Sequence, residues 1–437
     1  MATVHPFRGL RFNPEVVGDL TQVVTQPYDR IGADLMRAYL DRSPHNIVRI
    51  TGSKRPPGDE ADYRRRGELL QRWMAEGVLV RDSRPGIYAY HQQYEYEGTP
   101  FTRKGIVALL GLQAQGGGAK AHERTMKGPK EDRLKLLRAT EANFGHIFML
   151  YRDPARMATK ATDEGISGCV PDAEARDDFG NRHLLWHIGD EKAVEQVQRA
   201  MTEITPYIAD GHHRFETARA FMEECWGKGW RPVGPESFAS RMVTLVNVAE
   251  PGCVVRPTPR VVHSLSSFSL EMFLTQAERD FEVALLSSLE EAKQFLRERA
   301  SEHAFVAYSR GGYSGLVLRD EGSVDKLVPG QRSPEWKRLD VSILHGAILE
   351  RILGIDEDKL ARQTNVDYTE DSEGAIEAVD RGKGQVAFLL NPTPPEQVMA
   401  VADRGERMPQ KSTDFYPKLL TGIVAMRMQI DKDKGAT

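Results

Sequence analysis

The stretch YIADGHHRFETA, residues 207–218, carries the clearest structural signal in this chain of 437 residues. Its first three residues, 207–209, are apolar and typical of the end of a buried strand. Apolar side chains then recur at intervals of three and four residues from Phe215 to Cys225, which is the spacing of the inner face of a helix. The stretch therefore predicts a strand, a short turn and a helix in direct succession.

The predicted turn consists of the residues D-G-H-H-R, 210–214. The first amide groups of a helix lack backbone partners and the helix dipole is positive at this end, so oxyanions bind there readily. Gly211 allows the backbone to approach a phosphate closely, and Arg214 can donate two parallel hydrogen bonds to it. We predict that Gly211, His212 and Arg214 bind phosphate. His213 supplies a further donor and is predicted to be catalytic.

Asp210 is the unexpected member of this turn, because a carboxylate repels a neighbouring phosphate. It becomes useful if it binds a divalent cation or accepts a proton from an attacking hydroxyl, and both occur in phosphoryl transfer. We therefore predict that Asp210 is catalytic and is a ligand of Mg²⁺. The alternative is structural: Asp210 caps the helix and the two histidines pack in the core. A metal site made by His212 and His213 is disfavoured, since neighbouring side chains diverge and H-E-x-x-H spacing is absent.

A second concentration of polar residues is AKAHERTMKGPKEDRLKLLRAT, residues 119–140. A His-Glu pair, His122 and Glu123, beside a threonine on the approach to a helix is typical of a general base near an anion pocket. The predicted binding residues of this stretch are His122, Thr125, Lys127, Lys130, Asp132 and Arg133. The alternative is a solvated helix start, which most charge runs are.

A third polar stretch is MPQKSTDFYPKLLTG, residues 408–422, a proline-bounded segment without apolar periodicity. Its cation and two hydroxyl groups, from Lys411, Ser412 and Thr413, predict phosphate or carboxylate binding. The sequence contains neither G-x-x-x-x-G-K-[ST] nor a G-x-G-x-x-G that follows a strand. The common nucleotide-binding folds are therefore not indicated.

The composition of the whole chain excludes several classes of function. The 59 basic and 63 acidic residues give a formal net charge of -4, so no basic excess indicates nucleic-acid binding. The sequence has no apolar run of about 18 residues and no secretion signal, so we expect a cytoplasmic protein without a membrane partner. Three widely spaced cysteines without a C-x-x-C pair fit a reducing compartment.

Local patterns predict further elements. Residues 86–98 and 101–112 alternate as strands around a turn and predict a hairpin. The periodicity of residues 62–76 predicts a helix that ends at Gly77, and NIVRIT at 46–51 is typical of a strand. Composition and punctuation divide the chain into three expected regions, an N-terminal α+β region at 1–118, a catalytic core at 119–250 and a C-terminal α+β domain at 251–437.

Together, the motifs resemble known families. A His-Glu pair opening one helix, followed by a strand and then D-G-H-H-R opening another, resembles the ParB/sulfiredoxin-like fold and, within it, the free L-serine kinases. Over nearly its full length the chain also resembles a bacterial and archaeal family called domain of unknown function 1015. The matching pieces are FRGLRF, QPYDRI, HNIVRI, HERT, IADGHHR, LDVSILH and MPQKSTDFYPKL.

The resemblance implies an α+β fold with a ParB/sulfiredoxin-like core and N- and C-terminal additions. It implies a Mg²⁺-dependent kinase that phosphorylates free L-serine from ATP, ADP or pyrophosphate. Glu123 matches the catalytic base, Asp210 the aspartate near the hydroxyl or metal, and Gly211, His213 and Arg214 the phosphate-binding turn. Sulfiredoxin chemistry is excluded because His212 stands where a cysteine is needed. The alternative is a non-catalytic sensor of a nucleotide or phosphometabolite, and a homodimer is the commonest expectation.

Overall fold

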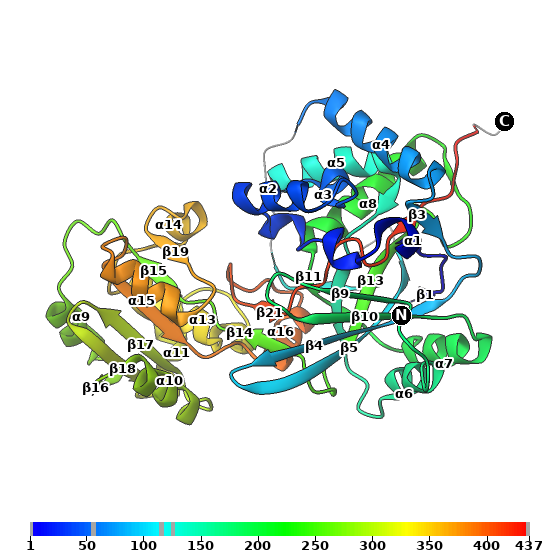
Figure 1. Ribbon diagram of the computed structural model, residues 1–437. Coiled ribbons are helices and arrows are strands. Elements are labelled where there is room, and N and C mark those ends of the chain that lie inside the picture. The colour runs from blue at the N-terminus through cyan, green and yellow to red at the C-terminus, as the bar shows by residue number, and fades with distance from the viewer. Residues whose placement is uncertain (1–2, 54–57, 113–117, 124–126, 434–437) are drawn as a thin grey trace. The chain divides into compact units, whose positions relative to one another are not determined.

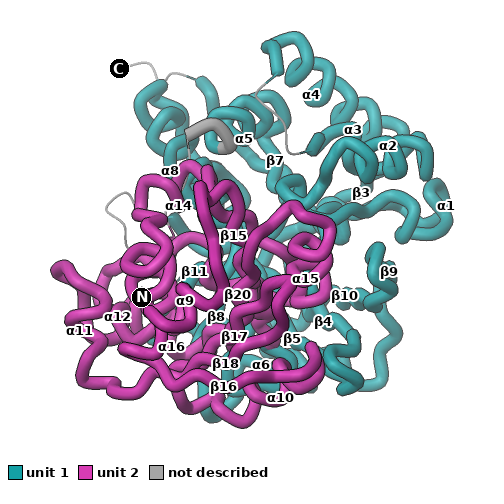
Figure 2. The backbone as a smooth tube through the Cα atoms, turned by 90° about the vertical axis from the view of Figure 1, so that its left-hand side faces the viewer, with its two compact units in different colours: residues 1–121, 125–253, 417–437 teal, residues 122–124, 254–416 magenta. Residues whose placement is uncertain are grey.

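The computed structural model describes residues 3–53, 58–112, 118–123 and 127–433. The chain folds into two compact units, which Figure 2 colours separately. Unit 1 comprises residues 1–121, 125–253 and 417–437, and unit 2 comprises residues 122–124 and 254–416. Within the described ranges, no helix has the length and apolar character needed to cross a lipid bilayer.

Unit 1 is built on a mixed sheet, which has nine strands among the described residues, in the order β6-β11-β8-β13-β5-β4-β10-β9, with β1 also paired to β5. Its strands are β1 (Val4–His5), β4 (Ile87–Tyr96), β5 (Thr99–Gly111), β6 (Lys120–Ala121), β8 (Ile147–Tyr151), β9 (Ala173–Arg176), β10 (Arg182–Ile188), β11 (Tyr207–Asp210) and β13 (Ser240–Asn247). Every residue of the adjacent strands β8 and β13 is buried, as expected for strands covered on both faces.

Helices cover both faces of this sheet (Figure 1). The helices α4, α5 and α8 lie together on one side, and α6 and α7 lie on the other. The helices of unit 1 are α1 (Pro14–Val17), α2 (Ala33–Arg42), α3 (Val48–Thr51), α4 (Glu60–Ala75), α5 (Lys127–Thr140), α6 (Met157–Gly165), α7 (Glu191–Met201) and α8 (His212–Gly227), with short 3₁₀ turns at Leu20–Gln22 and Tyr28–Arg30. Small pairs complete it: β2 (Leu10–Phe12) with β3 (Leu79–Arg81), β7 (Ala142–Asn143) with β22 (Met426–Arg427), and β12 (Arg231–Pro232) with β23 (Ile430–Asp431).

Unit 2 has its own sheet, in the order β16-β18-β17-β20-β15-β19. Alternate residues of β17 supply two separate cores, since Phe305 packs with one and Val306 with the other. The strands are β14 (Val254–Arg256), β15 (Arg260–Val262), β16 (Phe281–Leu286), β17 (Ala304–Ser309), β18 (Gly312–Leu318), β19 (Val366–Tyr368), β20 (Val386–Leu390) and β21 (Asp414–Tyr416). The helices are α9 (Leu270–Ala277), α10 (Leu289–Glu298), α11 (Val324–Leu327), α12 (Pro334–Lys337), α13 (Asp340–Ile343), the π-helix Leu344–Glu350, α14 (Glu357–Arg362), α15 (Ser372–Asp380) and α16 (Pro395–Asp403), with a 3₁₀ turn at Glu321–Ser323.

The predicted hairpin and the predicted helix are confirmed. Strands β4 and β5 pair in antiparallel register from Tyr88 opposite Val107 to Tyr96 opposite Thr99. Helix α4 is followed by Gly77, whose φ of 73° lies in the left-handed region that favours glycine. The mixed α+β class is also confirmed. A ParB/sulfiredoxin-like core stays a prediction.

The strand predicted at 46–51 is wrong, because residues 48–51 form the short helix α3. The Asn46 side chain accepts a hydrogen bond from the amide of Val48 at 3.0 Å and donates one to the carbonyl of Gln22 at 2.8 Å. These bonds favour a helical turn over the β preference of the branched residues. The three-region division stays a prediction; residues 1–118 and most of 119–250 lie in the same compact unit.

Candidate active site

The D-G-H-H-R stretch forms the turn that the sequence predicts. Strand β11 ends at Asp210, Gly211 adopts a left-handed φ of 94°, and α8 begins at His212. A Cβ atom at Gly211 would lie 3.1 Å from Nε of Arg214, so glycine also makes room for that guanidinium. The N-terminus of α8, which includes Arg214, therefore lies at the end of strand β11.

Asp210 is held between two cations. Its Oδ1 accepts a hydrogen bond from Nη2 of Arg214 at 3.1 Å, and its Oδ2 accepts one from Nζ of Lys418 at 2.9 Å. Burial raises the pKa of Asp210, but the charges of Lys418 and Arg214 outweigh it and hold that pKa well below its ordinary value. Asp210 is therefore a carboxylate at neutral pH and a weak proton acceptor.

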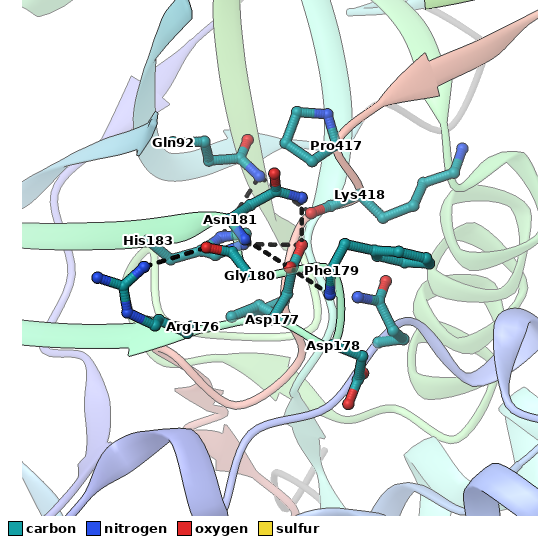
Figure 3. A network of polar contacts seen from close by, with 12 residues as sticks. Gln92, Arg176, Asp177, Asp178, Phe179, Gly180, Asn181, His183, Pro417 and Lys418 are labelled. Carbon is teal, nitrogen blue, oxygen red and sulfur yellow. Dashed lines mark hydrogen bonds and ion pairs between the residues drawn. The ribbon is translucent and has the colours of Figure 1, made fainter. Parts of the chain in front are cut away.

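Lys418 is positioned through the backbone of its own segment. Nε of Arg103 donates to Oε1 of Gln92 at 2.9 Å, and Arg103 also donates to the carbonyl of Pro417. Nε2 of Gln92 donates to the carbonyl of Lys418 at 2.9 Å. Figure 3 shows Gln92, Pro417 and Lys418 side by side. Two buried residues of the hairpin β4–β5 thus place the lysine that pairs with Asp210.

A buried polar network supports the same segment from the neighbouring strand. The hydroxyl of Tyr90 lies 2.7 Å from Nδ1 of His183 and accepts a hydrogen bond from the amide of Leu420 at 3.2 Å. Nε2 of His183 lies 3.3 Å from Oδ2 of Asp177, which also accepts from Nδ2 of Asn181 at 2.8 Å (Figure 3). The segment that carries Lys418 and Leu420 is therefore held by hydrogen-bonded residues of strands β4 and β10.

Next to the turn lies a cavity of about 60 Å³, space for on the order of four waters or one small oxyanion. Three arginines line it: Arg133 from α5, Arg214 from α8 and Arg241 from β13. The other lining residues are Tyr28, Thr51, Leu136, Leu137, Ala142, Phe144, Gly145, Thr217 and Thr421. Among the described residues that line this cavity, none carries a carboxylate.

Arg241 is the least compensated of the three cations. It is 5% exposed, its Nη2 donates to the carbonyl of Gly145 at 2.9 Å, and its Nε has no hydrogen-bond partner in the part of the chain that the structure describes. Burial, and next the charge of Arg214, lower the pKa of Arg241 to about 9. A buried cation that lacks a carboxylate is unfavourable unless an anion joins it. The cavity is therefore well suited to an oxyanion.

Of the predicted residues of α5, some line the cavity and others hold the helices together. Nε of Arg133 donates to Oδ2 of Asp132 at 2.6 Å, its Nη1 donates to the carbonyl of Thr51 at 2.9 Å, and its guanidinium lies 4.0 Å from the centroid of the Tyr28 ring. Asp132 also accepts from the hydroxyl of Tyr63 at 2.6 Å. Arg133 thus reaches the cavity while Asp132 ties α5 to α4.

Lys130 forms an ion pair with Glu216 on α8. Thr125 and the side chain of Lys127 lie outside the described residues, so their predicted roles stay predictions. His212 is buried, whereas His213 is partly exposed. Burial lowers the pKa of His213 and outweighs the opposing charges of Asp29 and Glu216, so its imidazole is neutral at pH 7.

The other predicted residues belong to unit 2. Nε2 of His122 lies 3.4 Å from Oγ1 of Thr413, and the carbonyl of His122 accepts a hydrogen bond from the amide of Met408 at 2.7 Å. The hydroxyl of Ser412 donates to the carbonyl of Pro409 at 2.6 Å. The third polar stretch therefore contacts the His-Glu motif within unit 2. The remaining residues there are Glu123, which is partly buried, and Lys411, which is exposed with a left-handed φ of 56°.

The described residues do not offer a ready magnesium site. Both oxygens of Asp210 are paired with cations, and no group of three or more His, Cys, Asp or Glu side chains in the described ranges is arranged around a metal position. Mg²⁺ prefers oxygen ligands with negative charge, which Lys418 and Arg214 already neutralise here. The role of Asp210 as a metal ligand stays a prediction, and this pairing argues against it.

Arg241 lies in no motif that the sequence analysis describes, and Lys418 lies in the third polar stretch, 408–422, but is not among its predicted binding residues. The one sequence signal for Arg241 is a charged residue inside the otherwise largely apolar run SRMVTLVN, which a buried strand accommodates only with a partner. Lys418 has a similar weak signal, since it follows the predicted residues 411–413 in the same stretch. Arg241 and Lys418 are assigned to the site because they lie close to the turn in the folded chain, and their local sequence pattern does not show this.

The fold and the site define an α+β protein with a cavity lined by three arginines beside a strand-to-helix turn. The chain belongs to the family described as protein of unknown function (DUF1015), whose model matches residues 4–342. No curated protein matches the chain.

Solved structures that are similar to the chain at low identity include the following three. A free serine kinase in complex with AMP has a TM-score of 0.34 and 13% identity, covering 71% of this chain and 88% of that chain. A conserved hypothetical protein from Pyrococcus furiosus has a TM-score of 0.32 and 14% identity, covering 69% and 89%. SbnI with C-terminal truncation from Staphylococcus aureus has a TM-score of 0.33 and 10% identity, covering 72% and 85%.

Proposed function

We propose that this protein is a phosphotransferase that moves a phosphoryl group from ATP, ADP or pyrophosphate to the hydroxyl group of a small molecule. Free L-serine is the proposed acceptor and O-phosphoserine the product. The acceptor rests on the resemblance of the His-Glu and D-G-H-H-R motifs to those of the free L-serine kinases. The reaction class rests on the chemistry of the site in unit 1.

One observation carries the proposal: Arg133, Arg214 and Arg241 line a single small cavity, and none of its described lining residues carries a carboxylate. Asp132 and Asp210 pair with Arg133 and Arg214, which leaves Arg241 as the cation without a carboxylate partner among the described residues. Phosphoryl transfer spreads negative charge over the transferred oxygens, so positioning and charge neutralisation supply most of the catalysis. Preformed guanidinium groups beside a helix N-terminus meet both needs. A neutral His213 adds a donor without adding repulsion between cations.

In the proposed step, the serine hydroxyl oxygen forms a bond to the transferred phosphorus. The bond from that phosphorus to the bridging oxygen of the donor breaks, and the leaving group, which is ADP, AMP or phosphate according to the donor, keeps the electron pair. The hydroxyl proton passes to a general base, the role that the resemblance to the free L-serine kinases gives to Glu123. Asp210, whose pKa is lowered, orients Arg214 and Lys418 rather than taking the proton. Bound Mg²⁺ would supply further neutralisation of phosphate charge.

The test is a donor-by-acceptor screen with the purified full chain. L-serine and Mg²⁺ are incubated with ATP, ADP or pyrophosphate in turn, and O-phosphoserine is detected by mass spectrometry. Glu123→Gln should lower kcat by about 10²–10⁴ with an unchanged unfolding curve, because a positioned base contributes this much. Glu131→Gln is the matched control, since Glu131 is 61% exposed on α5, and it should keep full activity.

Absence of product with every donor, together with measurable binding of the same donors, would contradict the kinase and favour the regulatory sensor. Equal activity of Glu123→Gln and the wild type would leave transfer intact but remove Glu123 as the base. Arg241→Gln should abolish donor binding as well as turnover, which separates the cavity from the base.

A further inference from the structure

A second and larger cavity, of about 550 Å³, lies within unit 2. This volume is in the range of pockets that hold cofactors and metabolites. It is formed by the segment 328–332, α12, α13, the π-helix, α14, β19 and the segment 407–410. The motif LDVSILH at 339–345 contributes to it, and the function proposed for unit 1 makes no use of this motif.

Four buried polar atoms in this cavity lack hydrogen-bond partners within the described part of the chain. They are Oγ of Ser342, Nε2 of His345, the hydroxyl of Tyr368 and Nη1 of Arg407, and all four residues line the cavity. Ser342 is 1% exposed. Buried polar groups in folded proteins are nearly always paired, and four unpaired groups around one cavity indicate a missing partner.

The backbone around these atoms has an uncommon form. Residues 344–350 form a π-helix, a conformation that is rare and recurs at functional sites. A Cβ atom at Gly346 would lie 2.7 Å from the carbonyl oxygen of Leu327, so only glycine permits this close approach. The π-helix turns His345 and Gly346 toward the cavity wall while its apolar residues stay in the core of unit 2.

The chemistry of the four groups selects the ligand. The guanidinium of Arg407 is a permanent donor, and the hydroxyls of Ser342 and Tyr368 can both donate. Burial lowers the pKa of His345, with the charge of Arg260 acting in the same direction, so its neutral ring can donate through Nε2. All four can therefore donate at once, and an oxyanion accepts several such bonds.

The walls of the cavity also offer an aromatic surface for the organic part of a ligand. Trp336 lines it, and its Nε1 donates to the carbonyl of Arg407 at 2.8 Å, which fixes the indole. The guanidinium of Arg332 lies 5.1 Å from the centroid of that indole. The carboxylates that line the cavity, from Glu350 and Glu357, are on exposed residues, where solvent screens their charge.

We propose that this cavity is a second binding site, which takes a small metabolite through a carboxylate or phosphate group bound by Ser342, Tyr368 and Arg407. The organic part of the ligand lies against Trp336. This site is separate in its residues from the arginine cavity of unit 1, so it does not depend on the phosphotransferase proposal.

Isothermal titration of the full chain tests the site. One series uses inorganic phosphate, pyrophosphate and O-phospho-L-serine, and a second uses citrate, L-malate and succinate. The same titrations are run with Tyr368→Phe, Ser342→Ala and Arg407→Gln. At least one probe should bind the wild type, and each substitution should weaken that binding about 10- to 100-fold, the usual effect of losing a hydrogen bond to a charged group. The series that binds identifies phosphate or carboxylate as the recognised group.

Two controls keep the result specific. Arg404→Gln removes a 59% exposed arginine close in sequence to Arg407 and should leave the affinity unchanged. Arg241→Gln should remove the binding proposed for the cavity of unit 1, and the affinity that remains should be that of the second site and should still depend on Tyr368 and Ser342. Tyr368→Phe removes only the hydroxyl and keeps the ring. If Arg407→Gln fails to fold, the affinity of Tyr368→Phe tests the proposal in its place. Binding of no probe at millimolar concentration, or binding that is indifferent to Tyr368→Phe and Ser342→Ala, would overturn the proposal and leave a water-filled cavity.

Discussion

Nζ of Lys418 donates a hydrogen bond to Oδ2 of Asp210 over 2.9 Å and so joins residues 208 positions apart in the sequence. The same aspartate accepts from Arg214, which lines the arginine cavity. The C-terminal segment of the chain therefore takes part in setting the charge of the D-G-H-H-R turn, and this relationship can be tested by substitution.

Lys418→Gln is expected to lower the free energy of unfolding by about 1.5–3 kcal/mol, the usual contribution of a hydrogen bond to a charged group. Asp210 then loses the largest of the charges that lower its pKa, so this pKa should rise. Urea unfolding at pH 7 measures the change. Lys228→Gln, which breaks a surface pair with Glu224 on α8, should lower the stability by less than about 1 kcal/mol. Equal losses in the two variants would contradict the special role of Lys418.

Gly211→Ala should destabilise the protein by about 1–3 kcal/mol, because alanine at a left-handed φ of 94° is strained and its Cβ would crowd Arg214. Phosphate binding should weaken in parallel. Thermal unfolding and isothermal titration measure the two effects. In Gly227→Ala, at the other end of α8, the new Cβ meets no atom within 4 Å, and this variant should be neutral or slightly stabilised.

Phosphate or pyrophosphate should raise the unfolding temperature of the wild type, since an anion compensates the buried charge of Arg241. A ligand at 100 times its dissociation constant adds about 2.7 kcal/mol. Arg241→Met should lose most of this effect while its own stability without anion stays similar or rises. Differential scanning fluorimetry gives both values. Equal stabilisation of Arg241→Met by phosphate would place the bound anion elsewhere.

His146 should make stability fall in acid. Burial, with help from Arg214 and Arg241, lowers the pKa of His146 from 6.5 to about 3 in the folded protein. Between these values the unfolded chain binds a proton that the folded protein does not, so stability is present above about pH 6.5 and is lost as the pH falls toward 3. The loss is at most about 1.4 kcal/mol per pH unit.

The measurement is the difference between His146→Gln and the wild type in urea unfolding from pH 7 to pH 4. The variant should show a shallower acid limb, although it is less stable at pH 7 because Nδ1 of His146 lies 2.7 Å from Oγ1 of Thr244. Parallel acid limbs would show that His146 does not titrate between the two states.

The local sequence pattern was sufficient to predict a strand or helix where one face of that element packs against the core. The hairpin β4–β5 and helix α4 follow their periods of two and about four residues, because burial of alternating side chains dominates their free energy. The same reasoning failed at 48–51, where the capping bonds of Asn46 outweigh the β preference of valine and isoleucine. The π-helix also cannot be predicted from local pattern, since it depends on the close approach of Gly346 to the backbone of Leu327, which lies outside the helix.

The strand, the left-handed glycine and the helix at 207–227 follow from neighbours in the chain, because steric limits and helical spacing act over a few residues. The arginine cavity does not. Arg133, Arg214 and Arg241 come from three elements, and their charges become a site only when α5, α8 and β13 pack together and exclude water. Burial turns an ordinary arginine of strand β13 into an uncompensated cation, and burial is a property of the folded chain.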